Sequence, residues 1–189
     1  MSAYLLTAPA AEPLSLADAK THLRVEHDDD DATIAALISS ARSHIEALTR
    51  CRMIAQTWRV VLDRWPPSGR IDPRLAPLRN VTAVRVFNEA NVASSVDTGG
   101  FVVDRARNVI AAPSWALPAP GRNVAGIELD VGIGFGDTAA DVPAVLLQAV
   151  RALVAHWYGN RGLIAIGQSV SVMPLSVNAM INSYRVMSL

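Results

Sequence analysis

A run of acidic residues near the N-terminus is the stretch whose composition most suggests chemistry. Residues 26–31 read EHDDDD, so four consecutive aspartates follow a glutamate and a histidine. Carboxylate oxygens are the ligands that hard divalent cations prefer. However, consecutive residues at a helix entry point in different directions, and no D-x-D-x-D-G calcium loop is present. A helical pattern starts directly after the run, which favours an N-cap and first-turn carboxylates at the positive end of a helix.

Other motifs for catalysis or cofactor binding are missing from the sequence. The four histidines form no H-x-x-x-H or H-E-x-x-H pair, and no G-x-S-x-G nucleophile motif occurs. The glycines of residues 132–136 lack both the G-x-G-x-x-G spacing and a P-loop lysine. A single cysteine, Cys51, excludes an intrachain disulfide and a cysteine metal cluster. We therefore expect no enzyme, no metal site and no cofactor.

Composition points to a protein that buries apolar surface against other subunits. The 189 residues are 51% hydrophobic and 18% charged, and the formal net charge is zero. A balanced charge disfavours tight nucleic-acid binding, which needs clustered Lys and Arg. No apolar run is long enough for a membrane span, and the N-terminus lacks the basic and apolar parts of a secretion signal. These features predict a protein made in the cytoplasm that does not bind membranes.

Two helices are predicted before the middle of the chain and two after it. Ser15 and Asp18 resemble a capping box, which predicts a short helix over 15–23. The second helix is predicted over about 30–50 by one apolar stripe, Ile34, Leu37, Ile38, Ala41, Ile45 and Leu48. A third is predicted from about 141 to 159. Pro174 opens a last short helix whose apolar face contains Val177, Met180, Ile181 and Tyr184.

The middle of the chain reads as strands separated by turns. Residues 57–65, 81–88, 100–104, 108–112 and 126–136 are rich in β-forming residues, and PPSG, NEAN, DTGG and PAPG lie between them. The sequence thus predicts an α+β fold. Its helical bundle, made by two N-terminal and two C-terminal helices, comprises residues 1–52 and 138–189. A mostly antiparallel β module is inserted at 53–137. Trp58, Trp65, Trp115 and Trp157 are expected to serve core packing or subunit contacts.

The order and spacing of several stretches resemble the head–tail connector, or adaptor, proteins of long-tailed phages and of phage-derived gene transfer agents. Residues 14–51 are similar to that family's opening helix pair, and MIAQTWRVVLDRWP (53–66) to the strand that follows. VPAVLLQAVRALVAHWYGNRG (142–162) is similar to its late helix, and PLSVNAMINSYRV (174–186) to its C-terminal helix. Residues 67–125 lie outside the resemblance.

The resemblance implies a structural virion protein at the head–tail junction. Such adaptors form a ring, commonly of twelve subunits, beneath the portal protein. The ring extends the DNA channel, which DNA crosses without sequence-specific binding, and stopper or tail-terminator proteins dock on it. In relatives the C-terminal segment reaches the portal. Carried onto this chain, the portal-facing residues are Val177, Met180, Ile181, Tyr184 and Arg185.

Charged residues elsewhere have a possible role in such a ring. The carboxylates of Asp28, Asp29, Asp30 and Asp31 exceed what one helix cap needs, so they are candidates for a surface at the channel or at a subunit seam. Arg151 and Arg161 are candidates for pairing with acidic groups of a neighbour. Two alternatives remain: another neck protein, such as a stopper or tail-completion subunit, and a small-ligand-binding β module. The first predicts helices that do not pack together, and the second a pocket with convergent polar groups.

Overall fold

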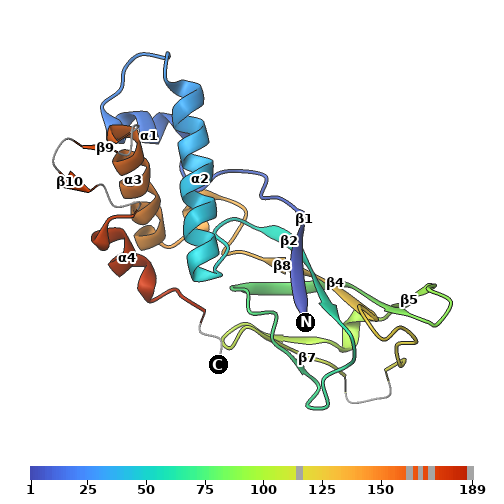
Figure 1. Ribbon diagram of the computed structural model, residues 1–189. Helices are drawn as coiled ribbons and strands as arrows, with labels where there is room; N and C mark the ends of the chain where they lie inside the picture. The colour runs from blue at the N-terminus through green and yellow to red at the C-terminus, as the bar shows by residue number, and fades with distance from the viewer. Residues whose placement is uncertain (114–116, 161–163, 166–167, 170–172, 187–189) are drawn as a thin grey trace. The chain divides into compact units, whose positions relative to one another are not determined.

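A computed structural model describes residues 1–113, 117–160, 164–165, 168–169 and 173–186 (Figure 1). The chain forms two compact units. The helical unit comprises Ala11–Ile54 and Gly136–Val186, and the β unit comprises Met1–Ala10 and Ala55–Phe135. In the described part of the chain, no helix is long and apolar enough to cross a membrane.

The helical unit contains α1 (Leu16–Leu23), α2 (Asp31–Thr49), α3 (Ala144–Gly159) and α4 (Leu175–Asn182). The Ser15 hydroxyl accepts a hydrogen bond from the backbone N–H of Asp18 and so caps α1, as predicted. A 3₁₀ helix, η2 (Ala139–Asp141), precedes α3, which begins one residue after Pro143. Two short paired strands, β9 (Ile164–Ala165) and β10 (Gln168–Ser169), lie between α3 and α4.

Helices α2 and α3 lie side by side, and α4 contacts both of them (Figure 1). The apolar stripes of α2, α3 and α4 face one another, so that their aliphatic side chains are buried together. The fully or almost fully buried residues are Ile34, Ile38, Ala41, Ile45, Leu146, Ala149, Val150, Leu153, Val154, Val177 and Ile181.

The β unit is built on a five-stranded antiparallel sheet with the strand order β1-β2-β8-β4-β5. Its strands are β1 (Ser2–Thr7), β2 (Gln56–Leu62), β4 (Leu78–Phe87), β5 (Ala93–Val96) and β8 (Ile127–Ile133). The alternation of apolar and polar residues along β8 puts Ile127, Leu129, Val131 and Ile133 on the buried face.

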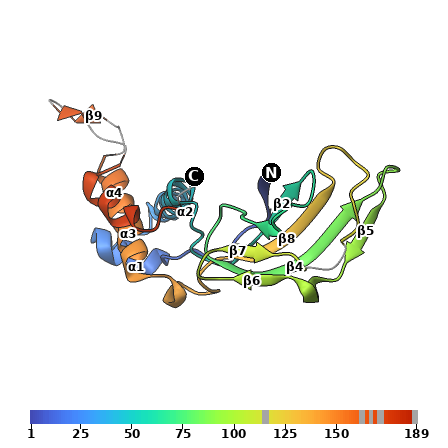
Figure 2. The ribbon, with the colours of Figure 1, turned by 90° about the horizontal axis from the view of Figure 1, so that it is seen from below.

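A second, three-stranded antiparallel sheet covers that face (Figure 2). It has the order β3-β7-β6, from β3 (Arg70–Ile71), β7 (Val109–Ala111) and β6 (Val102–Asp104). Ile71, Phe101 and Ile110 from this layer share one hydrophobic cluster with the apolar residues of β2, β4 and β8. A 3₁₀ helix, η1 (Thr98–Gly100), links β5 to β6.

The predicted α+β class, with helices flanking an antiparallel β module, is confirmed. The structure corrects the assignment of the first residues. Residues 1–10 were predicted to belong to the helical bundle, but β1 pairs with β2 and these residues lie in the β unit. Among the described residues, five strands were not predicted, namely β1, β3, β5, β9 and β10.

Candidate interaction surfaces

No arrangement for metal or thiol chemistry is found in the described part of the chain. No group of three or more His, Cys, Asp and Glu residues there is placed to hold a metal ion. The Cys51 thiol is buried, and burial, reinforced by the nearby charge of Glu46, raises its pKa to about 12. The thiol is therefore protonated at neutral pH and unreactive as a nucleophile.

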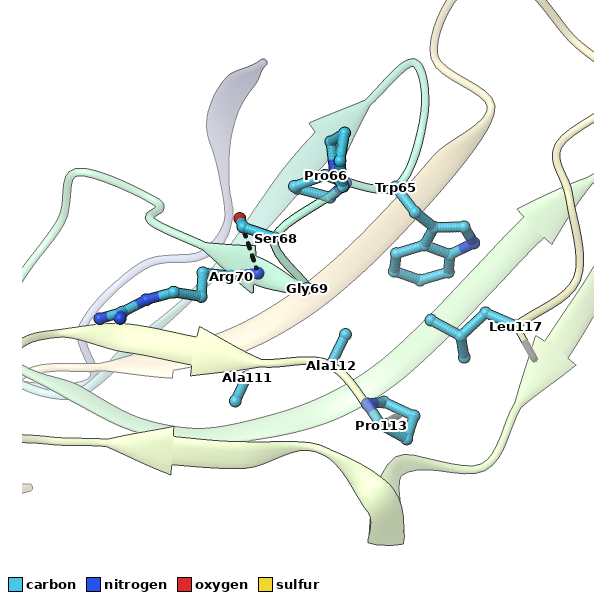
Figure 3. Close-up of a pocket in the computed structure, with 10 residues that line it drawn as sticks. Trp65, Pro66, Ser68, Gly69, Arg70, Ala111, Ala112, Pro113 and Leu117 are labelled. Carbon is cyan, nitrogen blue, oxygen red and sulfur yellow. Dashed lines mark hydrogen bonds between the residues drawn. The ribbon is translucent and has the colours of Figure 1, made fainter. Parts of the chain in front are cut away.

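The β unit has a cavity of about 490 Å³ beside Trp65 (Figure 3). The surroundings of the indole are apolar, with Pro66, Ala112 and Leu117 in the lining, while the guanidinium of Arg70 points away from it. The indole N–H donates to the Pro118 carbonyl at 2.9 Å. Trp65 thus has its polar atom satisfied within the chain, and the described residues that line the cavity do not bring together the convergent polar groups of a ligand site.

The acidic run connects helices of the same chain. The Lys20 ammonium on α1 lies 2.6 Å from a carboxylate oxygen of Asp28 and 2.6 Å from one of Asp31. Hydrogen bonding to Asp28, and then to Asp31, raises the pKa of Lys20, and the same contact lowers the pKa of Asp28. Asp28 and Asp31 therefore fix the turn between α1 and α2.

Asp30 occupies the N-cap position of α2, but its side chain makes no capping hydrogen bond. Its carboxylate instead accepts a hydrogen bond from the Tyr158 hydroxyl on α3, at 2.5 Å. The predicted capping role is therefore wrong for this side chain. Asp29 differs from its neighbours, because its side chain is 96% exposed and its carboxylate lies 3.8 Å from the Nδ1 atom of His27.

We expect Asp30→Ala and Tyr158→Phe each to lower the free energy of unfolding by about 1–2 kcal/mol, because each breaks a partly buried charged hydrogen bond. A double-mutant cycle followed by urea denaturation should give a coupling of at least about 0.5 kcal/mol. Asp29→Ala is the matched control and should change stability by less than about 0.5 kcal/mol. Additive effects of the two substitutions would exclude the Asp30–Tyr158 interaction.

The predicted portal-facing residues of α4 fall into two groups. Val177 and Ile181 are fully buried within the helical unit, so they attach α4 to its own chain and offer no exposed surface to a partner. Met180, Tyr184 and Arg185 are half-buried, and the Arg185 guanidinium donates to the Asn178 amide oxygen at 2.8 Å. The backbone N–H of Val186 donates to the Thr49 carbonyl at 2.8 Å, which joins the end of this segment to α2.

The two predicted arginines are placed differently. Arg151 is half-buried on α3 and makes no ion pair with any described residue, so its pairing with an acidic group of a neighbouring subunit stays a prediction. Arg161 lies outside the described residues.

Sequence reasoning missed two charged networks, one in each unit. In the helical unit, Glu46 is 2% exposed, accepts hydrogen bonds from Arg42 and from a backbone N–H, and forms an ion pair with Arg52. In the β unit, four side chains form alternating ion pairs across the outer face of the large sheet: Arg59, Arg85, Glu128 and Asp130. The alternation of charged and apolar residues in β8 marks these acids as facing outward, but their partners depend on strand order.

The chain is similar to proteins of known structural role. A family model described as phage gp6-like head-tail connector protein matches residues 13–109 and 122–185. A chain in the neck of an empty gene transfer agent (GTA) particle computed with C6 symmetry is 30% identical, with a TM-score of 0.82, and the match covers 100% of this chain and 97% of that chain. A chain of the virion of a native GTA particle is 27% identical, with a TM-score of 0.81 and the same coverage.

A third solved structure is the neck of a native GTA particle computed with C12 symmetry. Its matching chain is 28% identical with a TM-score of 0.79, and the match again covers 100% of this chain and 97% of that one. No curated protein matches. The family model spans most of the chain, including all four α-helices and the large sheet from β2 onward. The chain therefore belongs to the phage gp6-like head–tail connector family and is a structural connector protein.

Proposed function

We propose that this chain is one subunit of a ring, of about twelve copies, that joins the portal to the stopper or tail proteins of a phage or GTA particle and extends its DNA channel. The observation that carries the proposal is the full-length similarity to chains in GTA necks, one of them computed with C12 symmetry. The zero net charge agrees with a channel wall along which DNA slides.

A map of the particle tests the position of the chain directly. We expect the chain to fit a ring of density between the portal and the tail-side proteins, with DNA on the ring axis. Particles from a strain that lacks the gene should contain filled heads without attached tails. Normal tails in that strain would overturn the proposal.

The part of α4 that remains accessible supports a contact with the portal. Leu175 is 86% exposed, a large exposure for an aliphatic side chain at the start of a helix. Met180, Tyr184 and Arg185 are half-buried on the same segment. We therefore assign the portal contact to these four residues, while Val177 and Ile181 hold the helix in place.

Replacing Leu175 and Met180 together by Glu should reduce portal attachment at least about tenfold, because carboxylates would be buried in an apolar contact. The melting temperature should change little, since Leu175 is exposed and Met180 is only half-buried. Co-sedimentation with portal rings measures the attachment. Val145→Glu on α3, at a residue 44% exposed, is the control and should attach normally. Normal attachment of the α4 variant would place the portal contact elsewhere.

The exposed carboxylates of the α1–α2 turn are proposed to face the channel or a subunit seam. Asp28 and Asp29 have side chains 87% and 96% exposed, so their charges reach the surface even though Asp28 contacts Lys20. Asp29→Asn removes one of these charges without touching an internal contact other than the long one to His27. Weaker ring assembly or slower DNA release by this variant, at unchanged stability, would support the assignment.

A further inference from the structure

The large sheet of the β unit ends in two strands that have a neighbour on one side only. β1 pairs with β2, β5 pairs with β4, and neither pairs with another described strand on its outer side. The backbone N–H and C=O groups along an edge strand are a template for pairing with another chain. Figure 1 shows β5 at the end of the sheet opposite to β1.

Edge β1 is apolar and lacks the usual protection against pairing. Of the ten large apolar side chains that are exposed in the described part of the chain, four lie within the first six residues: Met1, Tyr4, Leu5 and Leu6. Solitary edges are normally protected by charged side chains or proline, but residues 1–7 contain neither. Such an edge is expected to be covered in the assembled protein.

Edge β5 is a suitable partner for β1. Residues 91–96 also contain no charged side chain and no proline, and Val92, directly before the strand, is 59% exposed. Each neighbouring pair in the order β1-β2-β8-β4-β5 is antiparallel, so β1 and β5 run in the same direction. A second copy placed beside the first with a small rotation therefore brings its β1 parallel to β5 of the first copy.

We propose that β1 of each subunit pairs in parallel with β5 of the next subunit and so forms a lateral contact of the ring. This inference rests on the proposed ring. A cyclic ring needs a heterologous contact between two different surfaces of the subunit, and two free edges of one sheet supply it. In a ring of twelvefold symmetry, as computed for the similar neck, each subunit is turned by about 30° relative to the next.

Disulfide cross-linking of the full-length chain tests the pairing in portal-bound necks. Leu5→Cys is combined in turn with Ala93→Cys, Ser94→Cys and Ser95→Cys. Adjacent strands lie about 4.8 Å apart, which allows a disulfide. Cys51 gives no background because it is buried and its pKa is raised to about 12. Oxidation should give a ladder of linked subunits, whereas single variants should give no ladder.

The direction of pairing is read from a second series with Ala3→Cys. In a parallel pair the best partner of residue 3 lies closer to the start of β5 than the best partner of residue 5, and the reverse order would overturn the proposed orientation. Rings that form normally but give no ladder with any pair would overturn the lateral contact while leaving the ring intact. A wild-type chain found outside the neck would instead contradict the proposed function.

A charge variant provides a second, independent readout. Leu5→Lys with Leu6→Lys should lower ring yield several-fold while the melting temperature of the subunit stays close to that of the wild type, because both side chains are exposed. Val145→Lys on α3, at a residue 44% exposed, is the control and should leave ring yield unchanged. Equal ring yield for all three proteins would also overturn the pairing of β1.

Discussion

Replacing Glu46 by alanine is expected to lower the free energy of unfolding by about 3 kcal/mol. Glu46 is 2% exposed, and its carboxylate lies 3.1 Å from the Arg42 guanidinium and 3.7 Å from that of Arg52. It also accepts a hydrogen bond of 2.8 Å from the backbone N–H of Met53, which is itself buried. Removing one partner of a buried ion pair costs about 3–5 kcal/mol, because the remaining charge is left without compensation.

The surrounding charges explain why Glu46 is needed. Burial lowers the pKa of Arg52, which shows that this cation is poorly solvated. Burial also acts to lower the pKa of Arg42, but the contacts with Glu12 and Glu46 outweigh it and the pKa is raised. Both guanidinium groups have side-chain exposures of only 12%, so water cannot replace the lost carboxylate.

Urea denaturation of three variants distinguishes the contribution of the buried Glu46 carboxylate from that of the more exposed Glu12 carboxylate. Glu46→Gln keeps an oxygen acceptor and should cost less than Glu46→Ala. Glu12→Ala removes the second, 34% exposed partner of Arg42 and should cost less than about 1 kcal/mol. If Glu46→Ala were no more costly than Glu12→Ala, the central place of Glu46 in this network would be disproved.

The helices were predictable because a 3.6-residue pattern is local. The stripe of Ile34, Ile38, Ala41 and Ile45 gave α2 within about two residues at either end. The same pattern did not predict burial in the last turn of α2, where Leu48 is 39% exposed while Glu46 and Thr49 are buried. The ion pairs of Glu46 and the hydrogen bond of the Thr49 hydroxyl to the Ile45 carbonyl override side-chain polarity there.

Strands whose partners are distant in sequence were harder to predict. β1 is paired with residues at least fifty positions away, and SAYLLT has no alternation of polar and apolar residues to mark it as a strand. β3 is two residues long, and β5 is a short run of small residues. Their existence depends on a neighbouring strand that supplies hydrogen bonds, which local propensity does not report.

For the candidate surface residues, too, the sequence identified local features but not their distant partners. The acidic run stood out by composition, but the partners that decide its role, Lys20 and Tyr158, lie on other helices. Val177 and Ile181 were correctly placed on one apolar face, yet a face pattern does not say whether its own chain or a partner covers it. In this fold α2 and α3 cover it, which leaves Leu175 and its neighbours for a partner.

Replacing Asp130 by alanine is expected to lower the free energy of unfolding by about 2 kcal/mol at neutral pH. Its carboxylate accepts from Arg59 Nε at 2.7 Å and from Arg85 Nη2 at 2.5 Å, so it bridges β2 and β4 across β8. Hydrogen bonding to Asp130 is also the main reason why the pKa of Arg59 is raised. The loss is smaller than for Glu46 because the two arginines are 22% and 25% exposed and regain some water.

The same substitution should abolish part of the pH dependence of stability. Burial acts to raise the pKa of Asp130, but hydrogen bonds from Arg59 and then Arg85 outweigh it, and the pKa lies below its usual value. Since the folded-state pKa is lower than the unfolded value of about 3.9, the stabilisation is complete above about pH 5 and is lost as the pH falls through the folded-state pKa. The wild type and Asp130→Ala should therefore differ in urea midpoint at pH 7, and this difference should shrink as the pH falls below about 4. Glu128→Ala removes the other acid of the ion-pair network and leaves the contacts of Asp130 with Arg59 and Arg85 in place. Its stability should therefore still fall by most of the same amount when the pH is lowered. The difference in urea midpoint between the wild type and Asp130→Ala could instead be the same at pH 7 and at pH 3. In that case the packing of the Asp130 side chain, and not its charge, would hold β2 and β4 to β8.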